Sequence, residues 1–268
     1  MKPAPFAYVR AESLEEAAAA LAAGERETKV IAGGQSLVPA LSMRLLRPDA
    51  LVDINRVLDL DNVARADGAL VVGATARQAD PRLHEHPLLA EALAHVGHVA
   101  TRNRGTVCGS VAHADPAAEL PLCLVLLEGS VRARSVRGER EIAARDFFLG
   151  PYTTALAADE LVVETRWPLL PPGTGAAFVE LAQRHGDYAL CTAGALADAD
   201  GGALRVAVGA VAERPLVLDV DPEAPGESAA AQVTPWGTVH ASPGYLRHLV
   251  RALVERAVAR ARERAEAA

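Results

Sequence analysis

The chain has 268 residues, of which 50% are hydrophobic and 23% charged, a composition typical of a folded globular protein. Its formal net charge of −7 argues against a nucleic-acid partner. No apolar run reaches the roughly 18 residues that a membrane-spanning helix needs, and residues 1–5 do not begin a signal peptide, so we expect a cytoplasmic protein without a membrane span.

The first 57 residues predict a small β-α-β-like subdomain. Ser13 is placed to cap a helix, and Glu16, three residues later, completes a capping box. We expect this helix to stop at Gly24. Short apolar runs predict strands at residues 29–32 and 50–54.

Two glycine-rich segments carry most of the functional information. Residues 32–37 read Ala-Gly-Gly-Gln-Ser-Leu, and residues 106–110 read Thr-Val-Cys-Gly-Ser and lead into residues 113–119. Consecutive backbone N–H groups in such turns form a concave donor surface for phosphate oxygens, so two of them could hold a pyrophosphate from two sides. The alternative is a pair of ordinary turns. Neither G-x-G-x-x-G nor a P-loop motif is present.

The rest of the chain alternates strands and helices. Apolar periodicity predicts strands at residues 70–74, 131–136 and 161–166 and helices at residues 87–96 and 117–127. Proline and glycine at residues 169–175 predict a boundary. Beyond it we expect a three-stranded meander at residues 178–182, 190–197 and 204–211, a mobile linker at 219–234, and an amphipathic helix from Pro243.

Cysteines and histidines predict no metal site in this chain. Cys108, Cys123 and Cys191 form no C-x-x-C pair, and an iron–sulfur cluster usually needs four thiolates. We expect Cys123 and Cys191 to be small buried apolar residues. The histidines have no metal-ligand spacing, and the following are expected to be solvated: His84, His86, His95, His98 and His240.

Taken together, these segments resemble the FAD-binding medium subunit of molybdenum hydroxylases, the flavoprotein family of aerobic carbon monoxide dehydrogenase and the xanthine dehydrogenases. The matching residues occur in family order and span essentially the whole chain: 32–37 with Pro39, 47–48, 51–55, 102–106, 114–117, 119–121 and 186–189.

The resemblance implies an α+β fold. Residues 1–172 would form a two-part FAD-binding domain of the vanillyl-alcohol-oxidase (PCMH) type, with subdomains at about 1–57 and 58–172. Residues 173–268 would form a small C-terminal α+β domain of the carbon monoxide dehydrogenase flavoprotein type, with a three-stranded antiparallel sheet and a terminal helix.

The resemblance also implies the site residues. The FAD pyrophosphate would be held by the first loop, Ala32, Gly33, Gly34, Gln35, Ser36 and Leu37, and by the second loop, Thr106, Val107, Cys108, Gly109 and Ser110. Asp115 follows the second loop, and Glu119 would hold sugar or ribityl hydroxyls, although a charge favoured at a helix start also explains it. Val96 and Val162 would line the flavin or simply belong to the core, and Tyr188 would lie near the flavin ring or be a half-buried strand residue.

One position departs from the family pattern. The family usually has two glycines where this chain has Cys108-Gly109. A cysteine strains the turn if the position needs a positive φ and is harmless otherwise, and a thiol beside a flavin could be oxidised.

The resemblance implies one subunit of a larger enzyme, because this chain has neither cluster cysteines nor an evident acid–base pair. A small [2Fe-2S] subunit and a large molybdopterin subunit would complete a heterotrimer, commonly paired into a dimer, and FAD would pass electrons to an external acceptor. A flavin-free structural or assembly subunit and a stand-alone flavin oxidase remain alternatives. Neither the substrate nor the acceptor follows from the sequence.

Overall fold

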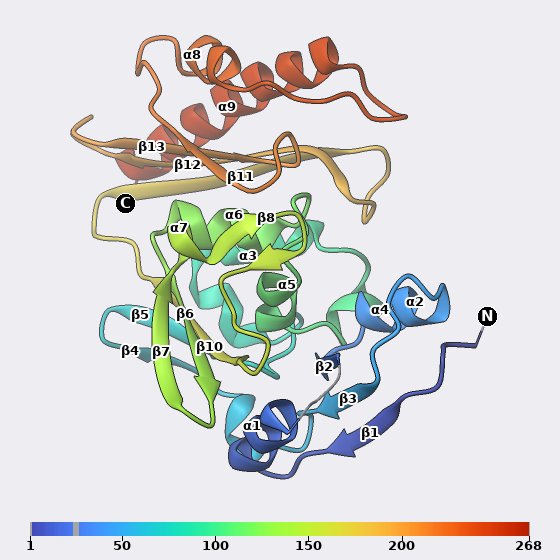
Figure 1. Cartoon of the computed structure of the whole chain (residues 1–268). Helices are drawn as coiled ribbons and strands as arrows, with labels where there is room; N and C mark the ends of the chain where they lie inside the picture. Colours follow the sequence, from blue (N-terminus) through green and yellow to red (C-terminus); the bar gives the residue numbers. More distant parts are fainter. Residues whose placement is uncertain (1, 24–26, 268) are drawn as a thin grey trace.

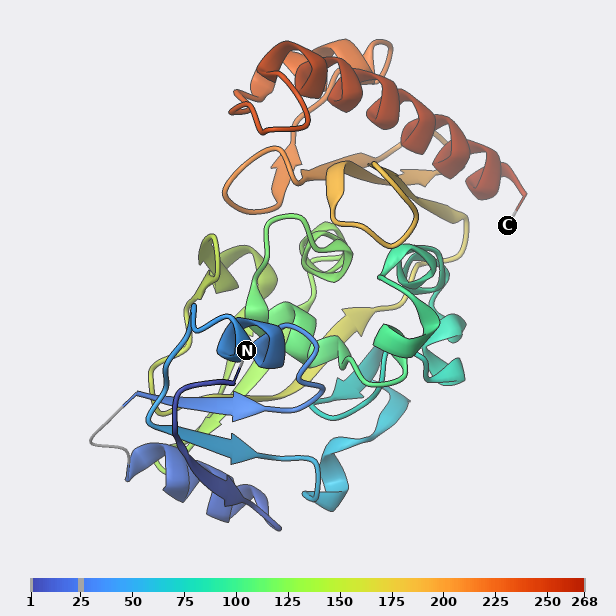
Figure 2. The ribbon, with the colours of Figure 1, turned by 90° about the vertical axis from the view of Figure 1, so that its right-hand side faces the viewer.

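A computed structural model describes residues 2–23 and 27–267. Its elements stack in layers (Figures 1 and 2). Two C-terminal helices cover one face of a four-stranded sheet, and the other face of that sheet lies on helices of the middle of the chain. Below these helices are a five-stranded sheet and, at the far end, a three-stranded sheet built from the N-terminal residues.

The N-terminal unit has the expected β-α-β character. In chain order it consists of β1 (Ala7–Arg10), α1 (Leu14–Ala22), β2 (Thr28–Ile31), α2 (Leu37–Ser42) and β3 (Ala50–Asp53). The strands are parallel in the order β1-β3-β2. Ser13 is the N-cap as predicted, because its Oγ accepts from the Glu16 N–H at 3.1 Å. The reciprocal bond differs from that of a capping box, because the Glu16 carboxylate accepts at 2.8 Å from the N–H of Glu12, one residue before the N-cap. The helix stop expected at Gly24 lies outside the described residues.

The middle of the chain forms an antiparallel sheet, in the order β4-β5-β10-β6-β7, and the helices that cover it. Its elements are the 3₁₀ turn Leu58–Leu60, β4 (Val63–Ala66), β5 (Ala69–Gly73), the 3₁₀ turn Pro81–Glu85, α3 (Pro87–His95), α4 (Val99–Arg102), α5 (Val107–His113), α6 (Glu119–Leu126), β6 (Ser130–Ser135), β7 (Gly138–Ala143), α7 (Ala144–Phe147), β8 (Phe148–Gly150), β9 (Thr153–Thr154) and β10 (Leu161–Pro168). The strands and helices predicted here are confirmed within a few residues.

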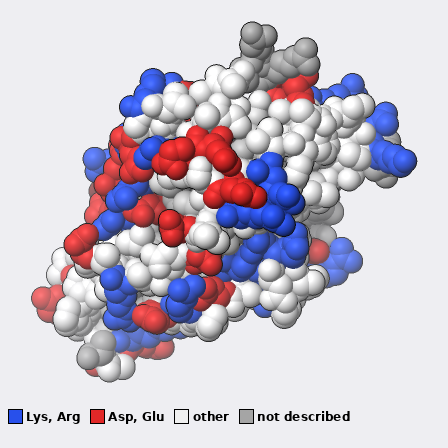
Figure 3. Space-filling view, turned by 90° about the horizontal axis from the view of Figure 1, so that it is seen from below, with Lys and Arg blue, Asp and Glu red and all other residues white. Residues whose placement is uncertain are grey.

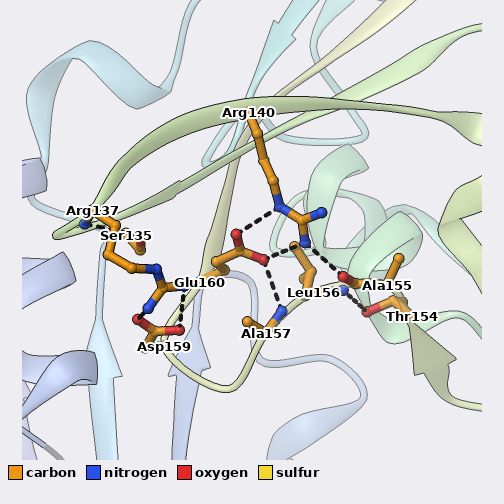
Figure 4. A network of polar contacts seen from close by, with 9 residues as sticks. All are labelled: Ser135, Arg137, Arg140, Thr154, Ala155, Leu156, Ala157, Asp159 and Glu160. Carbon is orange, nitrogen blue, oxygen red and sulfur yellow. Dashed lines mark hydrogen bonds and ion pairs between the residues drawn. The ribbon is translucent and has the colours of Figure 1, made fainter.

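Ion pairs fasten the loop before β10 to the β6–β7 hairpin (Figure 4). Arg140 donates to both carboxylate oxygens of Glu160, each at 2.7 Å, and Glu160 also accepts from the Ala157 N–H at 2.7 Å. Arg137 pairs with Asp159 beside it. Because the Glu160 side chain is only 6% exposed, this bidentate pair is better shielded from solvent than an ordinary surface ion pair.

The C-terminal sheet has four antiparallel strands, so the expected three-stranded meander is incomplete. Its strands are β11 (Thr174–Ala182), β12 (Ala189–Asp198), β13 (Leu204–Gly209) and β14 (Leu216–Leu218), in sequential order. The predicted terminal helix is confirmed as α9 (Pro243–Glu266), which packs on β11 and β12. The two elements approach closely at Gly175, where an added Cβ would lie 1.9 Å from the Ala261 carbonyl oxygen.

The prediction of a mobile linker at residues 219–234 is wrong. The segment contains helix α8 (Pro225–Gln232), which packs against α9. Four of its residues are buried, and the Gly226 N–H donates to Glu255 Oε1 at 3.0 Å. Small residues allow the two helices to approach closely, which a composition rich in Pro, Ala and Ser does not reveal by itself.

The prediction of a solvated His86 is also wrong. This residue is fully buried, and its Nε2 lies 3.0 Å from the Pro168 carbonyl oxygen. His84, His98 and His240 are exposed as expected, whereas His95 is only partly exposed. The three cysteines are buried and free, which confirms the apolar interpretation of Cys123 and Cys191.

The lower face of the C-terminal sheet is closed by α3 and α6. Glu91 on α3 forms a two-bond pair with Arg264 on α9, at 2.8 and 3.0 Å, and accepts from the Phe178 N–H of β11 at 2.8 Å. An added Cβ at Gly194 would lie 2.6 Å from Leu126 of α6. The sheet therefore has no free face.

Candidate functional site

The two glycine-rich loops meet in the folded chain. Gly33 is buried, and an added Cβ would lie 2.4 Å from the Arg104 carbonyl oxygen, 2.8 Å from Gly105 Cα and 3.0 Å from the Thr106 nitrogen. Only a residue without a side chain allows this approach. The sequence therefore brings two potential phosphate-binding segments, about seventy residues apart, to one place.

Backbone groups of the first loop remain available for a ligand. Gly34 has a φ of +71°, which favours glycine, and turns the chain after β2. Val38 donates to the Gly34 carbonyl oxygen, but among the described residues the N–H groups of residues 34–36 have no partner. Gln35 is exposed and Ser36 half-buried, so a ligand can reach this turn.

Asn55 and Arg77 connect the two loops by donating hydrogen bonds to backbone carbonyl oxygens, that of Ala32 in the first loop and that of Arg104 just before the second. Asn55 Nδ2 donates to the Ala32 oxygen at 2.7 Å, and Asn55 Oδ1 accepts from Arg77 at 2.6 Å. Arg77 also donates to the Arg104 oxygen at 2.6 Å. Asn55 belongs to the quoted resemblance, but sequence reasoning gave it no role and missed Arg77, because nothing near a single arginine indicates which distant carbonyls it reaches.

The second loop is the beginning of a helix and not a glycine turn. Thr106 is the N-cap of α5, and its hydroxyl accepts from the Gly109 N–H at 3.0 Å. The side chains of Thr106, Val107 and Cys108 are buried, whereas Gly109 is exposed and Ser110 half-buried. The accessible part of this loop is therefore its first helical turn, where the helix dipole favours an anion.

Cys108 fits this helix without strain. It lies in the first turn of α5 and is not among the residues with positive φ, so the harmless alternative for this position is correct. Its Sγ lies 3.3 Å from the Val72 carbonyl oxygen and 3.5 Å from Thr165 Oγ1. Burial raises the pKa of the thiol to about 12, which keeps it protonated and unreactive.

Two tyrosines and Asp115 form a wall beside these loops. Asp115 is buried and accepts from the Tyr152 hydroxyl at 3.2 Å, and burial together with this carboxylate raises the pKa of Tyr152 to about 12. Tyr188 is 65% exposed, and its hydroxyl interacts with Ser36 of the first loop. Burial of its hydroxyl end, Asp115 and Glu119 raise the pKa of Tyr188. The 184–188 turn is held close to the 97–98 turn, because an added Cβ at Gly186 would lie 2.7 Å from the His98 ring.

Glu119 is buried at the start of α6. Its burial, with Asp115 nearby, raises the pKa of this carboxyl to about 7, so the group is not an ordinary surface charge at a helix start.

Sequence reasoning missed Tyr152, which has a φ of +53° and donates its backbone N–H to the Ala114 oxygen at 2.9 Å. A tyrosine in the left-handed region carries no sequence signal.

The two valines expected beside the flavin belong to the apolar core around the five-stranded sheet. Val96 is 8% exposed at the end of α3, and Val162 is 6% exposed on β10. Both valines therefore lie in the core, and their place beside the flavin stays a prediction.

The described part of the chain offers no alternative metal centre. It contains no group of three or more His, Cys, Asp or Glu side chains that could hold a metal ion. Among the described helices none combines the length and the apolar character of a membrane span.

The face shown in Figure 3 carries basic and acidic groups side by side, and the largest basic group lies directly against acidic side chains.

Comparisons with known proteins agree with this geometry. Residues 4–170 match the family described as the FAD binding domain in molybdopterin dehydrogenase. The chain is 40% identical, over 99% of its length and 97% of the relative, to the 6-hydroxypseudooxynicotine dehydrogenase complex subunit alpha of Paenarthrobacter nicotinovorans.

Solved structures give the same result over the whole length. Quinoline 2-oxidoreductase from Pseudomonas putida 86 superposes with a TM-score of 0.92 at 36% identity, covering 99% of this chain and 100% of that one. A carbon monoxide dehydrogenase chain from Hydrogenophaga pseudoflava gives a TM-score of 0.92 at 31% identity, with 98% and 99% covered. The chain therefore belongs to the FAD-binding medium subunits of the multi-subunit molybdenum hydroxylases, and it is an oxidoreductase subunit with FAD as its cofactor.

Proposed function

We propose that this chain is the electron-transfer subunit of a heterotrimeric molybdenum hydroxylase. It takes electrons from a small [2Fe-2S] subunit and passes them through FAD to an external acceptor, while a large subunit with the molybdopterin cofactor oxidises the substrate. The observation that carries the proposal is the contact of Gly33 with residues 104–106, because it brings both phosphate-binding segments to one place.

The residues present fit FAD. The free N–H groups of residues 34–36 and the first turn of α5 would bind the pyrophosphate, with the hydroxyls of Ser36 and Ser110 as additional donors. Val107 and Cys108 would contribute through their backbone, since their side chains are buried. Bound FAD would supply a redox centre that accepts single electrons and delivers two.

The wall residues would orient the cofactor. Asp115 and Glu119 are carboxyl groups suited to hydroxyls of the ribityl or ribose portion, and the exposed ring of Tyr188 can stack beside the flavin. The Tyr188 hydroxyl interacts with Ser36 of the first loop, and Asp115 and Glu119 both raise its pKa.

We also propose the division of the chain. Residues 1–172 would form a PCMH-type FAD-binding domain with parts at about 1–57 and 58–172, and residues 173–268 a C-terminal domain of the carbon monoxide dehydrogenase flavoprotein type. The separate apolar cluster between the C-terminal sheet and α9 supports this division. The trimer would pair into a dimer in the cytoplasm.

The test compares the lone chain with the chain co-expressed with its neighbouring subunits. The lone chain should bind FAD, identified by chromatography after acid release, and should contain neither iron nor molybdenum. The complex should contain all three and oxidise substrate. FMN in place of FAD would contradict the pyrophosphate site, and substrate-dependent reduction of the metal-free chain at roughly 1 s⁻¹ or faster would favour a stand-alone flavin oxidase.

A further inference from the structure

A group of polar side chains is enclosed between the C-terminal sheet and helices α3 and α6. Glu180 on β11 and Thr192 on β12 are direct partners in the register of the two strands, so their side chains share one face of the sheet. The Glu180 side chain is 3% exposed, and Thr192 is fully buried. This is the face that α3 and α6 cover, since Phe178 on the same side of β11 contacts His95 of α3 at a ring distance of 5.5 Å.

These two residues have unsatisfied polar atoms. Among the described residues, Glu180 Oε2 and Thr192 Oγ1 have no hydrogen-bond partner. A buried polar atom without a partner loses its interactions with water and gains nothing in return, and such atoms are rare in folded proteins. Two such atoms on neighbouring strands can bind a buried water molecule, or they can belong to groups that exchange a proton.

Glu180 lies beside a partly exposed histidine, on the face of the sheet that α3 and α6 cover. Its Oε1 lies 3.9 Å from His95 Nδ1, and the His95 side chain is 34% exposed. Helix α6, which begins at Glu119, packs on β12 and β13 of the same face, and the charge of Glu119 raises the pKa of both Glu180 and Tyr188. Ionisable groups therefore lie on neighbouring elements, from the partly exposed His95 of α3 to Glu119 at the start of α6.

The pKa values of these ionisable groups suit proton transfer near neutral pH. Burial and Glu119 raise the pKa of Glu180 to about 8, and burial and Asp115 raise that of Glu119 to about 7. Burial lowers the pKa of His95, and the charges of His185 and Arg260 lower it further, whereas Glu91 raises it. The carboxyls of Glu180 and Glu119 can therefore hold a proton while the His95 imidazole is neutral and able to accept one.

We propose that His95 and Glu180 form a proton path between solvent and Glu119 at the cofactor site. The proposal rests on the proposed function, because two-electron reduction of FAD needs at least one proton, while the electrons come from the reductant. Glu119 would give its proton to the bound cofactor and take the next one from Glu180, Glu180 takes one from His95, and His95 takes one from solvent. Each group breaks one bond to hydrogen for each that it forms, so no residue of the path is oxidised or reduced.

The test uses the full chain loaded with FAD and reduced by dithionite in a stopped-flow instrument between about pH 6 and about pH 9. Glu180→Gln should slow reduction by roughly tenfold or more and remove an inflection of the rate near neutral pH. His95→Gln should act similarly, and added imidazole should restore its rate, because this position reaches solvent. Glu227→Gln, at an exposed pair with Arg251, is the matched control and should change neither rate nor profile.

A second measurement does not depend on FAD reduction. The infrared spectrum of the FAD-free chain at neutral pH should contain absorption of a protonated carboxylic acid that Glu180→Gln diminishes. Wild-type rates and pH profiles in both variants would overturn the path, and so would an unchanged infrared band in Glu180→Gln. If that variant does not fold, His95→Gln with imidazole decides. Failure of the wild-type chain to bind FAD would instead contradict the proposed function, and the infrared band would still test Glu180.

Discussion

The contact between the two glycine-rich loops can be broken by a single methyl group. In Gly33→Ala the new Cβ would lie 2.4 Å from the Arg104 carbonyl oxygen, whereas ordinary van der Waals contact begins at 3.4 Å. The two backbones must therefore separate by the difference, 3.4 − 2.4 = 1.0 Å. Neither atom in this contact is the flexible end of a side chain that could move aside.

The separation determines the expected loss of affinity. A backbone hydrogen bond of about 2.9 Å that lengthens by about 1 Å is no longer a hydrogen bond. If the pyrophosphate follows one loop, we expect it to lose about two bonds to the other loop. At about 1.5–3 kcal/mol for each bond to a charged group, the loss is about 3–6 kcal/mol, or roughly 10²- to 10⁴-fold in Kd.

The assay is a titration of the FAD-free chain with FAD, followed by flavin fluorescence, together with thermal unfolding of the FAD-free protein. Gly150→Ala is the matched control, because an added Cβ at Gly150 meets nothing within 4 Å. The control should bind like the wild type. If Gly33→Ala also binds FAD with the wild-type Kd, the two loops do not hold the pyrophosphate together and the reasoning fails.

Three further predictions follow from other contacts. Asn55→Ala removes the donor to the Ala32 oxygen and should weaken FAD binding by roughly 5- to 30-fold in the same titration; an unchanged Kd would leave Asn55 without a positioning role. Gly175→Ala should destabilise the FAD-free chain by about 1–3 kcal/mol in urea unfolding, because α9 must move away from β11, whereas Gly244→Ala, with open space around it, should not; equal stabilities would refute this. The pKa values of Glu119 and Glu180 are raised in the folded chain, so both protonated carboxyls stabilise the folded state. Their contribution to the free energy of unfolding should be complete below about pH 4.5 and should be lost as the pH rises to about 8. Glu180→Gln should make this loss smaller, and an identical dependence of the free energy of unfolding on pH in both proteins would contradict the prediction.

Local sequence signals were sufficient for most elements. The N-cap at Ser13, strands β5, β6 and β10 of the five-stranded sheet and helix α9 were predictable because their signals lie within one turn or one strand. Strands β4 and β7 of that sheet were not predicted. Helix α8 was not, because it has no regular apolar stripe and its order depends on contact with α9. Strand β14 has three residues, too few for a periodic pattern.

Some residues of the candidate site could likewise be predicted from local sequence, and others could not. Glycines and small polar residues at 32–37 and 106–110 identified both loops, and the structure brings them together at Gly33. Arg77 and Tyr152 escaped notice, because their importance depends on which distant backbone or carboxylate each one reaches. Glu180 escaped for a related reason, since a carboxyl on a strand is ordinary until the sheet is covered on both faces.

Helix α6 has a consequence for how the chain can be divided. All eight of its residues are buried, because neighbouring helices cover one side and the C-terminal sheet the other. A protease that cuts the irregular segment at residues 169–173 would sever the backbone without separating the pieces. Neither piece could be produced alone without exposing apolar surface that is normally shared, with Leu122 and Leu126 on one side and the face of Gly194 on the other. Nicked protein should therefore behave in gel filtration as an intact particle.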